Sequence, residues 1–149
     1  MHQTPAILSA DKIILNARPA DKAAAIDAVG RLLVATGHVT ADYIAAMFAR
    51  EAIATTYLGN GVAVPHGTKD SLAFVRSSGL AILHVPVGVD FGHGNTARLV
   101  IGLAARGDEH LDILTSLAEV CSDDARLEQL LASRSTDELI TRLQGGLPS

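Results

Sequence analysis

The chain has 149 residues, a length typical of a single domain with one substantial hydrophobic core. Its 16 acidic and 12 basic residues give a net charge of −4, and the basic residues are scattered, which argues against nucleic acid as the main partner. Aromatic residues make up only 3% of the chain and tryptophan is absent, which also disfavours a base-stacking surface.

Hydrophobic residues make up 48% of the chain, so membrane insertion has to be considered. The two richest stretches, 80–89 and 99–105, are far shorter than the roughly 20 apolar residues that cross a bilayer, and we expect them to be buried strands. Residues 1–5 lack the pattern of a secretory signal, so we expect a cytoplasmic location. Cys121 is the single cysteine, which excludes an internal disulfide and suggests a small core residue in a helix.

The first part of the chain predicts a short strand followed by a helix. Residues 11–15 form a β-rich run, and Asp21 begins a helical pattern that Gly37 ends. The apolar face of this helix consists of Ile26, Val29 and Leu33.

A second helix is predicted after Thr40, whose side chain can cap it. Its last turn contains Arg50 and Glu51, so Arg50 should emerge near a helix end. The apolar stripe of this helix consists of Ile44, Met47 and Phe48.

Residues 55–70 break the helical periodicity, because turn-forming residues surround a short apolar run at 62–64. This pattern predicts one short buried strand between two tight turns. Two longer strands follow, at 80–85 and 97–105, with a turn-rich connection over 88–94.

The last part of the chain predicts three helices. Asp108 can cap the first, and the other two span 123–131 and 135–143, with Ser135 and Glu138 at capping-box spacing. The shared face of the first consists of Leu111, Leu114, Leu117 and Cys121. Helices that alternate with strands indicate an α/β fold, which we expect to be a single layered domain with a mixed, mostly parallel sheet of about five strands and helices on both faces.

Several standard motifs are missing from the sequence. Val64 stands where a dinucleotide fingerprint beginning at Gly59 would need its third glycine, and no phosphate-binding loop is present. The metalloprotease and serine-hydrolase motifs are absent as well. The histidines are therefore the first candidates for chemistry.

His66 stands out because of its two neighbours. Pro65 favours an extended Val64, and Gly67 has no side chain and would let another molecule approach closely, so we expect an outward-pointing imidazole. A neutral imidazole is a nucleophile at physiological pH and can pass a phosphoryl group onward. The alternative is an ordinary turn with a solvated histidine.

Other polar residues could handle the charge of a phosphoryl group. The guanidinium of Arg50 can bind two phosphoryl oxygens, although the residue could also be only a helix-end cation. His110 lies in a predicted first helical turn, which favours anions, but alone it resembles an ordinary surface histidine. Thr55, Thr56 and Asn60 could donate hydrogen bonds to phosphoryl oxygens, although asparagine in a Gly-Asn-Gly turn usually serves the backbone.

The remaining histidines are weaker candidates. His84 lies within an apolar strand and fits a satisfied buried or edge residue, and His93 fits a loop. A metal site built from these two residues with His66 and His110 is a further alternative, but no pair among them has the close spacing of metal ligands. We therefore expect no metal.

Three segments, 49–51, 57–68 and 97–105, resemble the mannitol/fructose-type enzyme IIA (EIIA type-2) family of the bacterial phosphoenolpyruvate-dependent sugar phosphotransferase system. The likeness covers nearly the whole chain, and residues 98–114 look like the mannitol branch. It implies a single enzyme IIA domain over 1–149, with an ordered core at about 7–145. The family fold, a mixed sheet flanked by helices, agrees with the pattern above.

The resemblance also implies roles for particular residues. His66 matches the phosphorylated histidine, modified on Nε2, while Arg50 and His110 match two further active-site residues. From their own chemistry, and not from the resemblance, Thr55, Thr56, Asn60 and Gly67 are expected to support the phosphoryl pocket.

A phosphotransferase relay is the activity that the resemblance implies. His66 would accept its phosphoryl group from the histidine-containing phosphocarrier protein and donate it to a cysteine of enzyme IIB, with no cofactor. Membrane-embedded enzyme IIC would carry mannitol or a related sugar. Because no enzyme IIB or IIC segment is attached, the chain is expected to act as a free component. The alternative is a regulatory phosphoprotein of the nitrogen-related branch that uses the same histidine.

Overall fold

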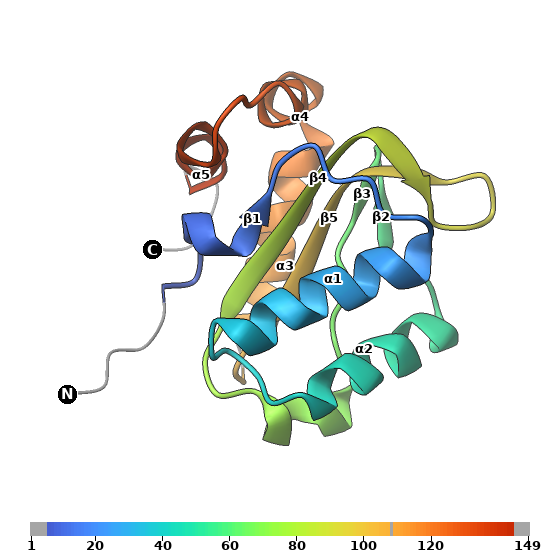
Figure 1. Ribbon diagram of the computed structural model, residues 1–149, viewed down its shortest axis with the longest axis vertical. Helices are drawn as coiled ribbons and strands as arrows, with labels where there is room; N and C mark the ends of the chain where they lie inside the picture. Colours follow the sequence, from blue (N-terminus) through green and yellow to red (C-terminus); the bar gives the residue numbers. More distant parts are fainter. Residues whose placement is uncertain (1–5, 108, 145–149) are drawn as a thin grey trace.

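Five strands form one mixed sheet in the order β1-β4-β5-β3-β2 (Figure 1). This computed structural model describes residues 6–107 and 109–144. The β1–β4 and β3–β5 pairs are parallel, whereas β4–β5 and β2–β3 are antiparallel. The strands span Ile13–Ile14 (β1), Tyr57–Gly59 (β2), Val62–Ala63 (β3), Gly79–Asp90 (β4) and Thr96–Ala104 (β5). The predicted α/β class and five-stranded mixed sheet are confirmed.

Helices cover both faces of this sheet (Figure 1). α1 and α2 pack on one face, and α3, α4 and α5 pack on the other. The helices span Lys22–Ala35 (α1), Asp42–Ile53 (α2), Glu109–Ser122 (α3), Asp124–Leu131 (α4) and Thr136–Gln144 (α5), and two 3-10 segments span Ala10–Lys12 and Lys69–Phe74. None of the helices within the described ranges is long and apolar enough to cross a membrane.

The two-residue period of β4 builds a separate core on each face. Leu80 and Ile82 belong to the core under α3 to α5, whereas Ala81 and Leu83 belong to the core under α1 and α2. Cys121 belongs to the core under α3 to α5, where burial raises the pKa of its thiol to about 11. The cysteine is a core residue, as predicted.

Two helices begin where the sequence predicts, at Asp21 and Ser135, and both of these side chains act as caps. The Asp21 carboxylate accepts a hydrogen bond from the Ala24 N–H at 2.8 Å, and the Ser135 hydroxyl accepts one from the Glu138 N–H at 3.1 Å. The prediction that Thr40 caps α2 is wrong, because its hydroxyl has no hydrogen-bond partner among the described residues. The predicted cap at Asp108 lies outside the described residues.

Two predicted apolar faces are right only in part. Met47 in α2 and Leu117 and Cys121 in α3 are buried as expected, but one predicted residue of each helix lies outside the buried face. In α2 the buried residues are Tyr43, Met47 and Glu51, spaced four apart. Phe48 lies about 100° around the helix from Met47 and is 36% exposed. In α3 the buried face starts at Ile113, and Leu111 lies on the opposite side with 70% exposure.

The region between α2 and β4 holds more structure than expected. The predicted single strand is the hairpin β2–β3, whose turn contains Asn60 at a φ of 57°. β4 also continues to Asp90, which shortens the predicted connection over 88–94. These differences do not change the order of the layers.

Lys12 and His38 form a buried polar pair beside β1. The Lys12 ammonium donates to His38 Nε2 at 2.6 Å, to the Ile7 carbonyl at 3.2 Å and to the Ala6 carbonyl. An ammonium group cannot accept, so Nε2 is unprotonated and Nδ1 holds the hydrogen, 3.0 Å from Ser77 Oγ. Burial, followed by the Lys12 charge, lowers the pKa of His38.

The buried Lys12–His38 pair predicts how the free energy of unfolding depends on pH. Below the ordinary histidine pKa of about 6.5, the unfolded chain takes up a proton at residue 38 that the folded chain does not, so the free energy of unfolding falls as pH falls. His38→Gln keeps an acceptor for Lys12 but cannot titrate. Urea unfolding between about pH 7 and pH 5 should therefore show a shallower slope for the variant, by at most about 1.4 kcal/mol per pH unit. Equal slopes would contradict the assignment.

Candidate active site

His66 lies just beyond β3, at the end of the sheet where β5 also ends. It forms an isolated parallel bridge with Leu103, and the Leu103 N–H donates to the Pro65 carbonyl at 2.8 Å. The residue is only 9% exposed, so the expectation of an outward-pointing imidazole needs correction: the ring is set into the surface. The extension of β3 along β5 is what places it there.

The His66 ring is held in one tautomer by its own backbone. Nδ1 lies 2.8 Å from the Val64 carbonyl oxygen, which can only accept a hydrogen bond. Nδ1 therefore holds the ring proton, and the lone pair of Nε2 is free. The nitrogen that the resemblance implies as the phosphorylation site is thus the nucleophilic one.

His110 lies against His66 and comes from α3, on the face of the sheet opposite to α1 and α2. It belongs to the first turn of α3, and the two ring centroids are 4.8 Å apart with an edge-to-face angle of 62°. Burial, and then the charge of Arg50, lowers the pKa of His110. The structure therefore brings these two predicted site residues together.

Arg50 supplies the cationic charge of this site. It lies in the last turn of α2, and its Nη1 donates to the Ala54 carbonyl at 2.6 Å. The pKa of His66 is lowered chiefly by burial, with smaller contributions from His110 and Arg50 in the same direction, while the Val64 carbonyl and Glu51 oppose the shift. His66 is consequently a neutral nucleophile near pH 7, with a guanidinium close enough to influence its charge.

Glu51 is a functional neighbour that the sequence analysis left without a role. Its carboxylate is buried and accepts hydrogen bonds from the Thr56 N–H at 3.1 and 3.2 Å and from the Thr56 hydroxyl at 2.5 Å. Lys22 Nζ lies 3.6 Å from the same carboxylate. The four-residue spacing from Tyr43 through Met47 to Glu51 was the signal that this side chain points inward.

Two of the three side chains expected to donate hydrogen bonds to a phosphoryl group, Thr56 and Asn60, donate to other groups of the protein. The Thr56 hydroxyl is bound to Glu51, and the Thr55 hydroxyl accepts from the Tyr57 N–H at 3.2 Å. Asn60 donates both amide hydrogens at the junction of α3 and α4, to the carbonyl of Cys121 at 2.9 Å and the carboxylate of Asp124 at 3.0 Å. The Asn60 amide therefore fastens the β2–β3 turn, and its geometry does not support the expected role in the phosphoryl pocket.

Gly67 is needed for close packing inside the protein. A β-carbon at this position would come within 2.6 Å of Tyr43 Cε1 and would also collide with Ser71 Oγ. The space above Gly67, where we expected another molecule to approach, is therefore occupied by Tyr43 and Ser71 of the protein.

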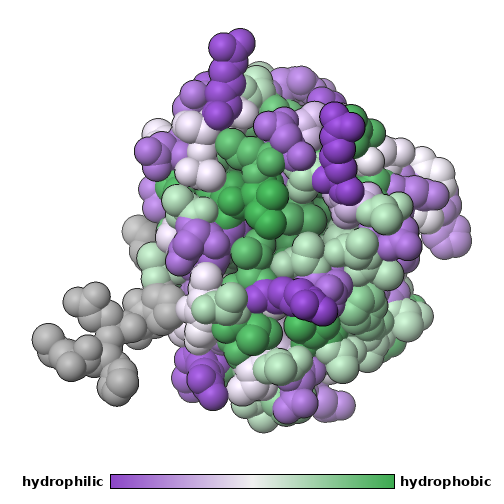
Figure 2. Space-filling model, viewed as in Figure 1, coloured by the Kyte–Doolittle hydropathy of each residue, from purple (hydrophilic) through white to green (hydrophobic). Residues whose placement is uncertain are grey.

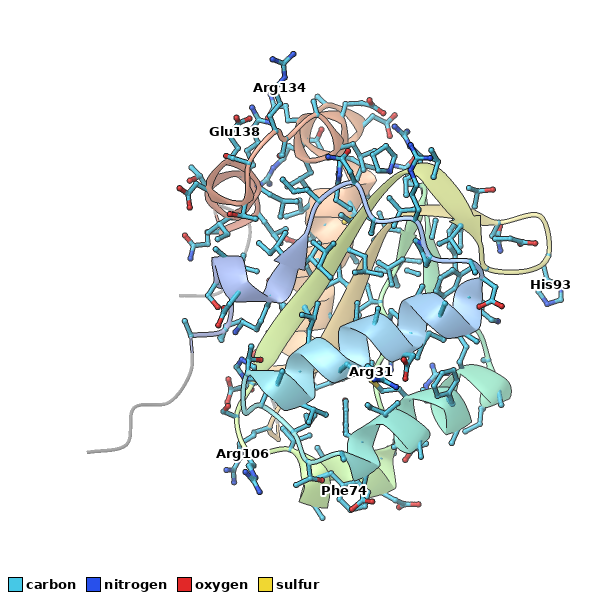
Figure 3. All side chains as sticks on the ribbon, in the orientation of Figure 1. Arg31, Phe74, His93, Arg106, Arg134 and Glu138 are labelled. Carbon is cyan, nitrogen blue, oxygen red and sulfur yellow. The ribbon has the colours of Figure 1, made fainter. Side chains whose placement is uncertain are left out.

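The remaining histidines lie outside the cluster. His84 is buried and satisfied, because its Nδ1 accepts from the Asn16 N–H at 3.1 Å and its Nε2 donates to the Leu131 carbonyl at 2.7 Å. His93 lies in the exposed β4–β5 loop (Figure 3). Both agree with the structural interpretation of their sequence context. Among residues 6–107 and 109–144, no group of three His, Cys, Asp or Glu side chains is placed to hold a metal ion.

Comparison with known proteins gives a consistent assignment. The family model for the phosphoenolpyruvate-dependent sugar phosphotransferase system, EIIA 2, matches residues 6–145. The mannitol-specific phosphotransferase enzyme IIA component of Geobacillus stearothermophilus is 44% identical over 137 residues, which are 92% of this chain and 94% of that protein. The mannitol-specific EIICBA component of Escherichia coli K12 is 41% identical over 140 residues, which are 93% of this chain and 22% of that protein.

A solved structure agrees in fold as well as in sequence. It is the solution structure of the complex between mannitol enzyme IIA and phosphorylated enzyme IIB of Escherichia coli. A chain of that complex aligns with a TM-score of 0.87 and 40% identity, and the match covers 93% of this chain and 97% of that one. The chain described here therefore belongs to the EIIA 2 family of the phosphoenolpyruvate-dependent sugar phosphotransferase system.

Proposed function

We propose that His66 accepts a phosphoryl group on Nε2 from the histidine-containing phosphocarrier protein and passes it to a cysteine of enzyme IIB. The observation that carries this proposal is the hydrogen bond from His66 Nδ1 to the Val64 carbonyl, which leaves Nε2 unprotonated in a ring that lies against His110 and under the influence of Arg50. Membership of the EIIA 2 family supports it.

Each transfer conserves the phosphoryl group. The Nε2 lone pair attacks the phosphorus of the donor phosphohistidine, and the P–N bond breaks with its electron pair returning to the donor ring. A cysteine thiolate then attacks the same phosphorus, and the electron pair of the second P–N bond returns to His66. Arg50 stabilises the charge on the phosphoryl oxygens, and the protein positions the reactants without a cofactor.

Two successive proteins have to reach this nitrogen. Ile53 lies three residues after Arg50 and is 74% exposed, and Leu111 follows His110 and is 70% exposed. Hydrophobic colouring also marks the surface over α2 in the lower right of Figure 2. Apolar side chains beside a buried reactive group suit transient protein docking.

Mannitol is the sugar that we propose for this system. The relatives described above bear the name of mannitol components, and one of them joins enzyme IIA to enzymes IIC and IIB in one chain. We accordingly expect enzymes IIB and IIC of mannitol type as direct and indirect partners, with this chain acting in the cytoplasm.

The first test is phosphorylation itself. With enzyme I, the phosphocarrier protein and phosphoenolpyruvate, the intact mass of the wild-type protein should rise by one phosphoryl group, and purified mannitol enzyme IIB should then remove it. His66→Ala should stay unmodified, whereas the loop variant His93→Ala should behave like wild type. An unmodified wild-type protein, or phosphorylated His66→Ala, would refute the proposal.

Arg50→Gln should slow phosphoryl transfer by roughly 100-fold, because the variant loses the charge that stabilises the phosphoryl oxygens. Its free energy of unfolding should change by less than about 1 kcal/mol, as expected for a helix-end arginine. Arg31→Gln, which removes an exposed arginine paired with Asp27, is the matched control. Stopped-flow transfer rates equal to wild type would exclude the role of Arg50.

Arg50→Gln also tests the electrostatic effect of Arg50 on the two histidines without any partner protein. Removing the Arg50 cation should raise the pKa of both His66 and His110, because that charge lowers both values in the wild-type protein. An NMR titration of the imidazole resonances measures the shift. A pKa of His66 that stays the same or falls would show that Arg50 does not act on the ring.

A further inference from the structure

Tyr43 makes two buried hydrogen bonds at the edge of the active site. It lies in the first turn of α2 and is 4% exposed. Its hydroxyl donates to the Leu103 carbonyl at 2.8 Å and accepts from the Gly67 N–H at 2.9 Å. Burial raises the pKa of Tyr43 to about 12, so the phenol keeps the proton that it donates.

Both partners of this hydroxyl are direct neighbours of His66. The Gly67 N–H belongs to the peptide bond that joins His66 to Gly67, and Leu103 is the residue that pairs with His66 across the bridge. The Leu103 N–H holds the Pro65 carbonyl on the other side of His66. The backbone on either side of the imidazole is thus fixed, once by β5 and once by Tyr43.

The ring of Tyr43 also packs closely against the backbone at Gly67. A β-carbon on Gly67 would approach Tyr43 Cε1 to 2.6 Å, so glycine lets the ring lie directly against the backbone. Tyr43 and Arg50 are seven residues apart, about two turns of α2, and therefore point in similar directions. The contact ties the helix that contains Arg50 to the loop that contains His66.

We propose that Tyr43 is a positioning residue for phosphoryl transfer: its hydroxyl sets the place of the His66 imidazole relative to Arg50. This inference rests on the proposed phosphoryl transfer at His66. Loss of the hydroxyl would leave the Gly67 N–H and the Leu103 carbonyl without their partner and would allow the loop to shift against α2. A small displacement of a nucleophile is enough to slow a group transfer considerably.

The chain contains a matched control for this residue. Tyr57 is the second of the two tyrosines of the chain, and it lies where β3 and β5 begin. Its hydroxyl accepts from the Gly61 N–H at 2.8 Å and donates to the Thr96 carbonyl at 3.4 Å. Tyr43 bridges the ends of these two strands, beside His66. Tyr43→Phe and Tyr57→Phe therefore each remove a hydroxyl that bridges β5 to the chain beside β3. The first is buried next to His66, and the second is more exposed at the opposite end of these strands.

Rates of phosphoryl transfer from the phosphocarrier protein distinguish the two variants. Tyr43→Phe should lower kcat by about 10- to 100-fold with little change in KM, because docking is preserved and the nucleophile is displaced. Tyr57→Phe should match wild type. A kcat for Tyr43→Phe within twofold of wild type, or equal losses in the two variants, would overturn the proposal.

NMR of the unphosphorylated protein separates this inference from the function it rests on. The ring resonances and pKa of His66 should change in Tyr43→Phe and stay the same in Tyr57→Phe, whether or not any partner phosphorylates the chain. A wild-type protein that accepts no phosphoryl group would refute the proposed function alone. Unchanged His66 resonances in Tyr43→Phe would refute the positioning role alone.

A second variant covers the case in which Tyr43→Phe does not fold. In Tyr57→Phe, biosynthetic incorporation of a fluorotyrosine labels residue 43 only and lowers the pKa of its phenol without removing the hydroxyl. The loss of kcat at alkaline pH should then begin at a lower pH than in unlabelled Tyr57→Phe, because ionised Tyr43 cannot donate to the Leu103 carbonyl. An unshifted profile would overturn the inference.

Discussion

The hydrogen bond from His66 Nδ1 to the Val64 carbonyl determines what this site can do. Pro65 favours an extended Val64, whose N–H donates to the Thr56 carbonyl at 3.0 Å and whose carbonyl accepts from the imidazole two residues later. The consequence is a ring with a fixed tautomer and a fixed nucleophilic nitrogen. A short sequence, Val-Pro-His, thus determines which ring nitrogen is the nucleophile.

The other groups of the site come from opposite faces of the sheet. α2 brings Arg50 from one face and α3 brings His110 from the other, and the two helices meet His66 at the end of β3 and β5. Burial keeps both imidazoles neutral by lowering the pKa of each. Under the proposed function, the Arg50 guanidinium is the charge that would receive a phosphoryl group, and the exposed Ile53 follows Arg50 by three residues in the chain.

The sequence was sufficient for the features that depend on local pattern. The Pro-His-Gly turn and the family resemblance singled out His66, Arg50 and His110 as site candidates, of which the structure brings His66 and His110 together. Periodicity located the five helices found in the described residues and the two long strands. Features that depend on the rotation of a helix about its axis were less predictable. An error of one residue in the phase of α2 placed Phe48 inside and left Tyr43 and Glu51 without a role, although these two buried residues accept hydrogen bonds from the Gly67 and Thr56 N–H groups.

Features that depend on distant contacts could not be deduced at all from one sequence. Asn60 has a plausible position for a phosphoryl ligand, yet its amide is used by the α3–α4 junction more than 60 residues away. The buried Lys12–His38 pair likewise joins segments with no shared motif.

The most direct test of this account is 15N NMR of the His66 ring in the phosphorylated protein. We predict that the phosphoryl group resides on Nε2 and that Nδ1 retains its proton and its hydrogen bond to Val64. Phosphorylation on Nδ1 would require that hydrogen bond to be broken and would contradict the mechanism proposed for this site.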